Sequence, residues 1–113
     1  MTFSVAHILA TAAACALAAA GFAWWKLRRW PDVLAVFALS GAAVFLWRQS
    51  ANLPQLNADG LPGFSANDWA APILAYLSLS IYADLRQPSP AAAFGEVRAL
   101  TALACLVINV ITI

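Results

Sequence analysis

The chain has 113 residues, of which 64% are hydrophobic and only 10% are charged. A soluble domain carries about 25% charged residues, and a chain this short could not bury so much apolar surface in a core of its own. The net charge of +1 argues against a nucleic-acid partner, which requires clustered cations on a solvated face. The composition therefore predicts an all-α integral membrane protein with a single membrane domain, residues 1–113.

The first predicted membrane span covers residues 3–25, since about 20 apolar residues cross the hydrocarbon layer. A secretory signal peptide carries its positive charge before the apolar region, but residues 1–25 contain no Lys or Arg. We therefore expect a retained span rather than a cleaved signal. Small residues at four-residue spacing, Ala10, Ala14 and Ala18, favour close packing against another helix. The alternative is that alanine serves here only as a good helix former.

A basic turn follows the first span and is expected to set the orientation of the chain. Its cations are Lys26, Arg28 and Arg29. Pro31 suits the first turn of a new helix, because the missing N–H has no partner there anyway. Tryptophan rings favour the headgroup level of a membrane. The expected interface anchors are Trp24, Trp25 and Trp30 beside this turn, with Trp47 and Trp69 at the opposite interface.

Three further spans are predicted at residues 33–48, 69–85 and 90–113. Arg48 closes the second span, where its side chain could extend toward the headgroups. The outer loop, residues 49–68, carries Leu53, Leu56 and Leu61. The leucines suggest that this loop lies on the membrane surface or on a partner. The alternative is an ordinary surface loop. Within it, Ser65 and Asp68 have the spacing of a helix-capping box.

The distribution of cations predicts which way the spans run. Five of the six Lys and Arg residues flank the ends that face one side, and only Arg48 lies at the other. Because cytoplasmic loops carry the excess of Lys and Arg, the turns after the first and third spans are expected in the cytoplasm. The protein is then a four-helix membrane protein with both termini on the outer side, expected in a bacterial inner membrane.

Polar residues follow one face of the first span and one face of the fourth, at three- and four-residue spacing. In the first span they are Ser4, His7, Thr11 and Cys15, and in the fourth Thr101, Cys105, Asn109 and Thr112. We call these eight residues the polar seam. If the two spans are antiparallel neighbours, Cys15 and Cys105 lie at the same depth, and Thr11 is the expected partner of Asn109.

Polar side chains within a membrane turn toward protein or water. The seam therefore indicates hydrogen-bonded adhesion between helices or, alternatively, a polar path with His7 at its outer end, since histidine can change its charge near neutral pH. Zinc requires about four ligands close together, and haem requires an axial ligand for which only His7 is available. We expect no metal, no cofactor and no catalytic residues. A weaker stripe, Tyr76, Ser80 and Asp84 on the third span, is interpreted as a solvated helix end.

In length and predicted span number the chain is similar to the small multidrug resistance transporters. That family works through a membrane-buried glutamate in its first span, and this first span has none. The resemblance is therefore one of size, and the family's transport mechanism does not carry over.

Two functions remain as expectations. The first is an accessory or structural subunit of a larger membrane complex, contacting lipid and other membrane subunits, because the spans leave little extramembrane mass for an active site. The alternative is a homo-oligomeric transporter or pore-former, holin-like or exporter-like, that uses the polar seam. An enzyme is not expected, since acid–base or nucleophilic chemistry needs converging groups that the sequence does not supply.

Overall fold

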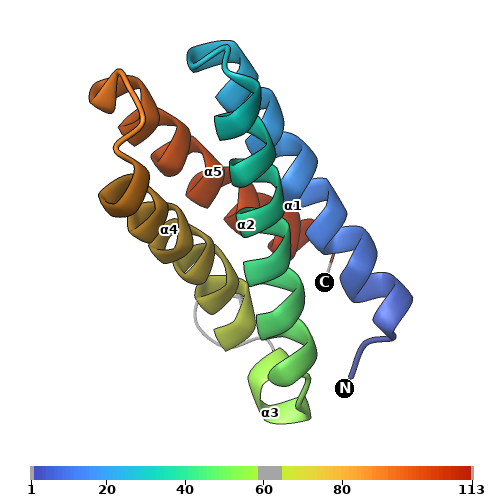
Figure 1. Ribbon diagram of the computed structural model, residues 1–113. Coiled ribbons are helices and arrows are strands. Elements are labelled where there is room, and N and C mark those ends of the chain that lie inside the picture. The colour runs from blue at the N-terminus through green and yellow to red at the C-terminus, as the bar shows by residue number, and fades with distance from the viewer. Residues whose placement is uncertain (1, 59–64, 113) are drawn as a thin grey trace.

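The computed structural model describes residues 2–58 and 65–112, and the regular structure of this part of the chain is helical (Figure 1). Four long helices and one short one follow each other. They are α1 (Val5–Lys26), α2 (Trp30–Ser50), α3 (Pro54–Asn57), α4 (Ala66–Arg86) and α5 (Ala91–Thr112). The helix α3 was not predicted and lies within the expected outer loop. Leu61, which the loop prediction also used, lies outside the described residues.

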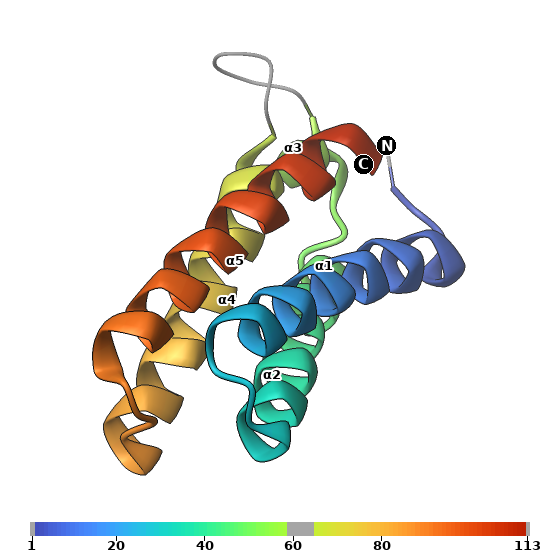
Figure 2. The ribbon, with the colours of Figure 1, turned by 90° about the horizontal axis from the view of Figure 1, so that it is seen from above.

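The four long helices form a closed ring in which each packs against two others. Helix α1 contacts α2 and α5, and α4 contacts the same two helices from the opposite side. Figures 1 and 2 show that successive long helices run in opposite directions and that both ends of the chain lie at the same end of the bundle. We call this the termini end, and the end with the α1–α2 and α4–α5 turns the turn end.

Local chemistry fixes the helix ends. Ser4 caps α1 by accepting a hydrogen bond from the backbone N–H of His7 at 3.1 Å. The α1–α2 turn places Arg28 at φ 58°, and Gln87 ends α4 at φ 47°. The capping box predicted for Ser65 and Asp68 is confirmed, and α4 begins directly after Ser65.

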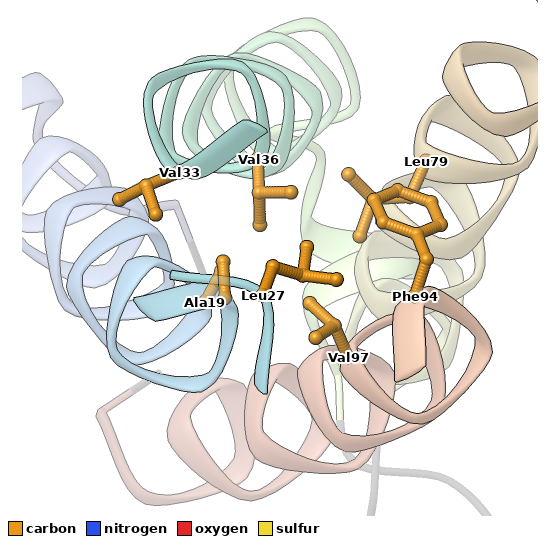
Figure 3. Close-up of a cluster of buried hydrophobic side chains, with 8 residues drawn as sticks. Ala19, Leu27, Val33, Val36, Leu79, Phe94 and Val97 are labelled. Carbon is orange, nitrogen blue, oxygen red and sulfur yellow. The ribbon is translucent and has the colours of Figure 1, made fainter. Parts of the chain in front are cut away.

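The core of the turn end is apolar. Figure 3 shows side chains from all four long helices and from the α1–α2 turn converging between the helices. Its buried members are Ala19, Ala23, Leu27, Val33, Val36, Leu79, Phe94 and Val97. The core of the termini half is built from smaller residues, Ala12, Cys15, Val44, Ala71, Ala75 and Cys105. Small residues let the helix backbones approach closely. An ideal Cβ on Gly41 of α2 would lie 3.0 Å from Cβ of Ala16 on α1.

Three helices, α1, α2 and α5, are long and apolar enough to cross a membrane, which indicates a small multi-pass membrane protein. The third expected span, residues 69–85, lies within α4. This helix is as long as α2, but its lower mean hydropathy leaves it outside that group. The helices also differ from the predicted spans at their ends. For example, α2 begins at Trp30 rather than at residue 33.

Candidate functional site

A buried ion pair joins α2 to α4 at the termini end. Arg48 Nη1 donates a hydrogen bond to Asp68 Oδ1 at 3.1 Å, and the exposed fractions of the two side chains are 1% and 4%. The second carboxylate oxygen, Asp68 Oδ2, accepts from the backbone N–H of Ser65 at 2.9 Å. One carboxylate thus caps α4 and neutralises the buried cation of α2. Arg48 was expected to extend toward the headgroups. That expectation is wrong, because Arg48 lies on the face of α2 that packs inside the bundle.

Asn109 extends this ion pair to the other two long helices. Arg48 Nη1 also donates to Asn109 Oδ1 at 3.3 Å. The amide nitrogen of Asn109 donates to the carbonyl of Cys105 at 2.7 Å and to Cys15 Sγ at 3.7 Å. We call these four side chains, Arg48, Asp68, Asn109 and Cys15, the core network. The core network therefore contacts α1, α2, α4 and α5 together.

A second set of hydrogen bonds covers the core network at the termini end. Asn67 is fully buried, and its amide nitrogen donates to the carbonyl of Ala51 at 2.8 Å and to Asn57 Oδ1 at 2.7 Å. Its amide oxygen accepts from Trp47 Nε1 at 3.0 Å. Asn52 holds the N-terminal segment through two hydrogen bonds with the backbone of Phe3, at 2.8 and 3.0 Å. These amides fix the α2–α3 connection and the start of α4 against the bundle.

The structure brings most of the polar seam together between α1 and α5. The hydroxyls of Thr11 and Thr112 lie 2.8 Å apart, and the His7 ring nitrogen Nε2 donates to the carbonyl of Thr112. Cys15 and Cys105 are both fully buried and belong to the same core cluster.

The remaining seam positions differ from the expected pairing. Asn109 bonds Cys15 rather than Thr11, because its side chain turns inward toward Arg48 and leaves Thr112 beside Thr11. Ser4 is used as the cap of α1. The hydroxyl of Thr101 is buried, with no hydrogen-bond partner in the part of the chain that the structure describes.

The residues expected to set the topology cluster at the turn end. Lys26 Nζ lies 2.8 Å from Glu96 Oε2, and Arg29 Nε lies 3.8 Å from Asp32 Oδ2. The guanidinium of Arg28 lies over the ring of Trp24 at 5.4 Å. Four of the expected anchors are exposed, namely Trp24, Trp25, Trp30 and Trp69. Trp47 differs, because it is half-buried and hydrogen-bonded to Asn67.

The weaker stripe on α4 is divided between two roles. Arg98 of α5 donates to the hydroxyl of Ser80 at 3.2 Å and lies over the ring of Tyr76 at 4.9 Å, which ties α5 to α4. Asp84 is exposed near the end of the helix.

Sequence reasoning missed the pairing of Arg48 with Asp68. The two residues are 20 positions apart and are separated by a connection that had been expected to stay outside the bundle. The available signal was compositional, since one acid three residues after the capping serine and one cation at the preceding span end lie at the same predicted depth. A charge inside a membrane bundle usually pairs with another charge.

The chemistry of this arrangement is adhesion between helices. The cation and the carboxylate of the core network neutralise each other. The amide nitrogen of Asn109 donates its hydrogen bonds to the Cys105 carbonyl and to Cys15 Sγ. Within the described ranges, no group of three His, Cys, Asp or Glu side chains is arranged to hold a metal ion. Comparison with protein-family models, curated proteins and solved structures found no match to this chain.

Proposed function

We propose that the protein is a four-span subunit of a larger complex in a bacterial inner membrane, with an accessory, non-enzymatic role and both termini on the outer side. The cations support this orientation. Arg48 is buried and neutralised by Asp68. The other five Lys and Arg residues lie in or beside the two turns or, for Arg98, in the half of α5 nearer the turn end, and these are the cations that can hold this end of the bundle in the cytoplasm.

The outer face of α4 supports its role as a membrane span beside α1, α2 and α5. Trp69, Ile73, Leu77 and Ile81 follow each other at four-residue spacing and are between 42% and 60% exposed. They form an apolar stripe along the helix, which suits contact with lipid. The hydroxyls of Ser78 and Ser80 donate to the carbonyls of Leu74 and Tyr76, so these polar groups are satisfied within α4 itself. The lower hydropathy of α4 therefore comes in part from groups that have partners within the protein, including Asn67 and Asp68.

The observation that carries the subunit proposal is the mutual pairing of polar groups inside the ring. Asn109 and Arg48 bond within the core network, and Thr11 bonds Thr112. A conducting path instead needs polar groups free to exchange hydrogen bonds with water or an ion. The bond between Asn109 and Arg48 and the bond between Thr11 and Thr112 favour helix adhesion over the transporter or pore alternative.

Co-expression of two differently tagged copies tests the proposal. The membranes are extracted into native nanodiscs, one tag is captured, and the recovered chains are quantified. We expect unlike membrane chains at a fixed ratio to the captured copy, with the second tag absent. Recovery of the second tag without unlike chains would favour the homo-oligomeric transporter or pore-former instead. A copy carrying Arg48→Met, which leaves the buried Asp68 carboxylate without its cation, serves as control for unfolded protein that adheres nonspecifically.

A further inference from the structure

A polar hollow lies at the turn end, between the start of α2 and the end of α4. Its volume is about 230 Å³, which is room for several water-sized groups. Pro31, Leu85 and Pro88 form apolar parts of its wall, and the polar parts come from Arg29, Asp32, Tyr82 and Arg86. None of these side chains belongs to the core network or the polar seam.

One of the two carboxylate oxygens of Asp32 accepts no hydrogen bond from the described residues. Tyr82 donates its hydroxyl hydrogen to Asp32 Oδ1 at 2.6 Å. Asp32 Oδ2 is buried and has no hydrogen-bond donor among the described residues, and Arg29 Nε lies 3.8 Å from it. The residue as a whole is only 4% exposed. A buried carboxylate oxygen without a donor is costly, so a bound ligand that supplies an N–H group would stabilise it.

The same hollow also presents two guanidinium groups. Arg29 and Arg86 both line it and both are exposed, so their donors are available to an anion. Guanidinium groups bind phosphate well, because their N–H donors match the spacing of phosphate oxygens. The wall therefore offers an acceptor for a cation beside donors for a phosphate. A ligand that carries both groups a few bonds apart fits this arrangement.

The surrounding aromatic rings place the hollow at headgroup depth. Trp30, next to Pro31 in the hollow wall, is 62% exposed and stacks on Trp24 with 4.9 Å between ring centroids. Lys26 lies over the ring of Trp25 at 4.2 Å. Exposed tryptophans with cations among them mark the membrane interface.

We propose that this hollow binds the phosphoethanolamine headgroup of a membrane phospholipid. Its phosphate contacts Arg29 and Arg86, and its primary ammonium donates to Asp32. The proposal depends on the four-span arrangement proposed above but not on the subunit role. Lipid binding here fixes the end of α4 to the start of α2, next to the existing bond between Tyr82 and Asp32.

The test compares two lipids with the same phosphate and the same acyl chains. The full chain is reconstituted in nanodiscs with equal amounts of phosphatidylethanolamine and phosphatidylcholine, and the lipids that remain bound are counted by native mass spectrometry. Phosphatidylcholine keeps the positive charge but has no N–H to donate. We expect retention of phosphatidylethanolamine to be higher by about tenfold, since a hydrogen bond to a charged group is lost in the other lipid.

Three variants identify the groups that are responsible. Asp32→Asn keeps an oxygen for the Tyr82 hydroxyl but loses the negative charge, so the preference between the two lipids should disappear. Arg86→Gln should lower the retention of both lipids, because it acts on the phosphate. Asp84→Asn, which removes an exposed carboxylate of α4 outside this hollow, should leave the preference unchanged.

Equal retention of the two lipids by the unaltered chain would overturn the proposal, as would tighter retention of phosphatidylglycerol. So would loss of the preference in Asp84→Asn to the same degree as in Asp32→Asn. Displacement of the bound lipid by soluble glycerophosphoethanolamine at equal concentration would show a soluble ligand instead. If Asp32→Asn fails to fold, Arg86→Gln and the comparison of lipids still decide the outcome. A negative result leaves the ratio of unlike chains in the two-tag capture unaffected, so the two proposals can fail separately.

Discussion

Arg48 and Asp68 form an ion pair that is withdrawn almost completely from the surface of the bundle, with 3.1 Å between Nη1 and Oδ1. The pair joins the end of α2 to the start of α4, the only long helix that is not apolar enough by composition to be a candidate span among those described. Because Asp68 also caps α4 through Ser65, the ion pair fixes both the start and the position of this helix. In the four-span arrangement that we propose, the placement of α4 in the membrane therefore depends on a contact inside the protein.

Replacing one member of the ion pair should be more damaging than replacing both. Arg48→Met leaves the Asp68 carboxylate buried without its cation, which costs about 3 to 5 kcal/mol of stability. The double variant Arg48→Met with Asp68→Asn removes both charges and should recover part of that loss. Stability can be followed through Cys15 and Cys105, since these fully buried thiols become reactive only when the bundle opens. Arg28→Met, at an exposed cation of the turn end, is the matched control. Equal reactivity of all three variants would contradict a stabilising role for the pair.

The variant Asn109→Leu distinguishes a role of the polar seam in holding helices together from a role as a polar path. The change removes hydrogen bonds to Arg48, Cys15 and the carbonyl of Cys105, and we expect a loss of about 1 kcal/mol, typical of an interhelical hydrogen bond in a membrane. Cellular function should fall only as far as the amount of folded protein falls. Complete loss of function with the folded amount unchanged would instead support a polar path along the seam. Function can be scored by complementation of a deletion strain, and the amount by quantitative immunoblotting.

Two glycines provide a matched pair for the packing of α1 against α2. A side chain at Gly41 meets Ala16 of the facing helix, so Gly41→Val should force the helices apart and cost about 1 to 3 kcal/mol. An added Cβ at Gly21 meets nothing within 4 Å, so Gly21→Ala should be neutral or stabilise α1 by up to about 1 kcal/mol. Thermal unfolding in detergent measures both. A destabilisation of equal size at the two positions would rule out close approach at Gly41 as the cause.

Neutralising the basic turn should disturb insertion. The triple variant Lys26→Gln, Arg28→Gln and Arg29→Gln removes three of the six cations, and cation bias sets the orientation of short-looped membrane proteins. It also removes the ion pair of Lys26 with Glu96. We expect a lower membrane level and a mixed topology. Glu96→Gln alone is the control for the ion pair and should keep a single topology. Unchanged orientation in the triple variant would contradict the cation argument.

The sequence was sufficient to predict the long helices and the turn chemistry, because apolar length, proline position and the capping box are local signals. The polar faces of α1 and α5 could also be read from spacing. Their pairing could not, since it depends on how the two helices rotate about their axes. Asn109 is directed at Arg48 by a contact with a third helix, and this rotation places Thr112 beside Thr11. The ion pair and the four-residue helix α3 were missed for the same reason, because both depend on how distant segments fold back on the bundle.

The most direct test of the account is whether α4 crosses the membrane. Single cysteines are introduced at Ala58, in the α3–α4 connection, and at Ser89, in the α4–α5 turn; both positions are exposed. The chain with only its native Cys15 and Cys105 is the blank, because both are fully buried. In intact cells a membrane-impermeant maleimide should label Ala58→Cys from the outside, and it should label Ser89→Cys only after the inner membrane is opened. Labelling of both positions from the same side would show that α4 does not cross and would contradict the four-span arrangement.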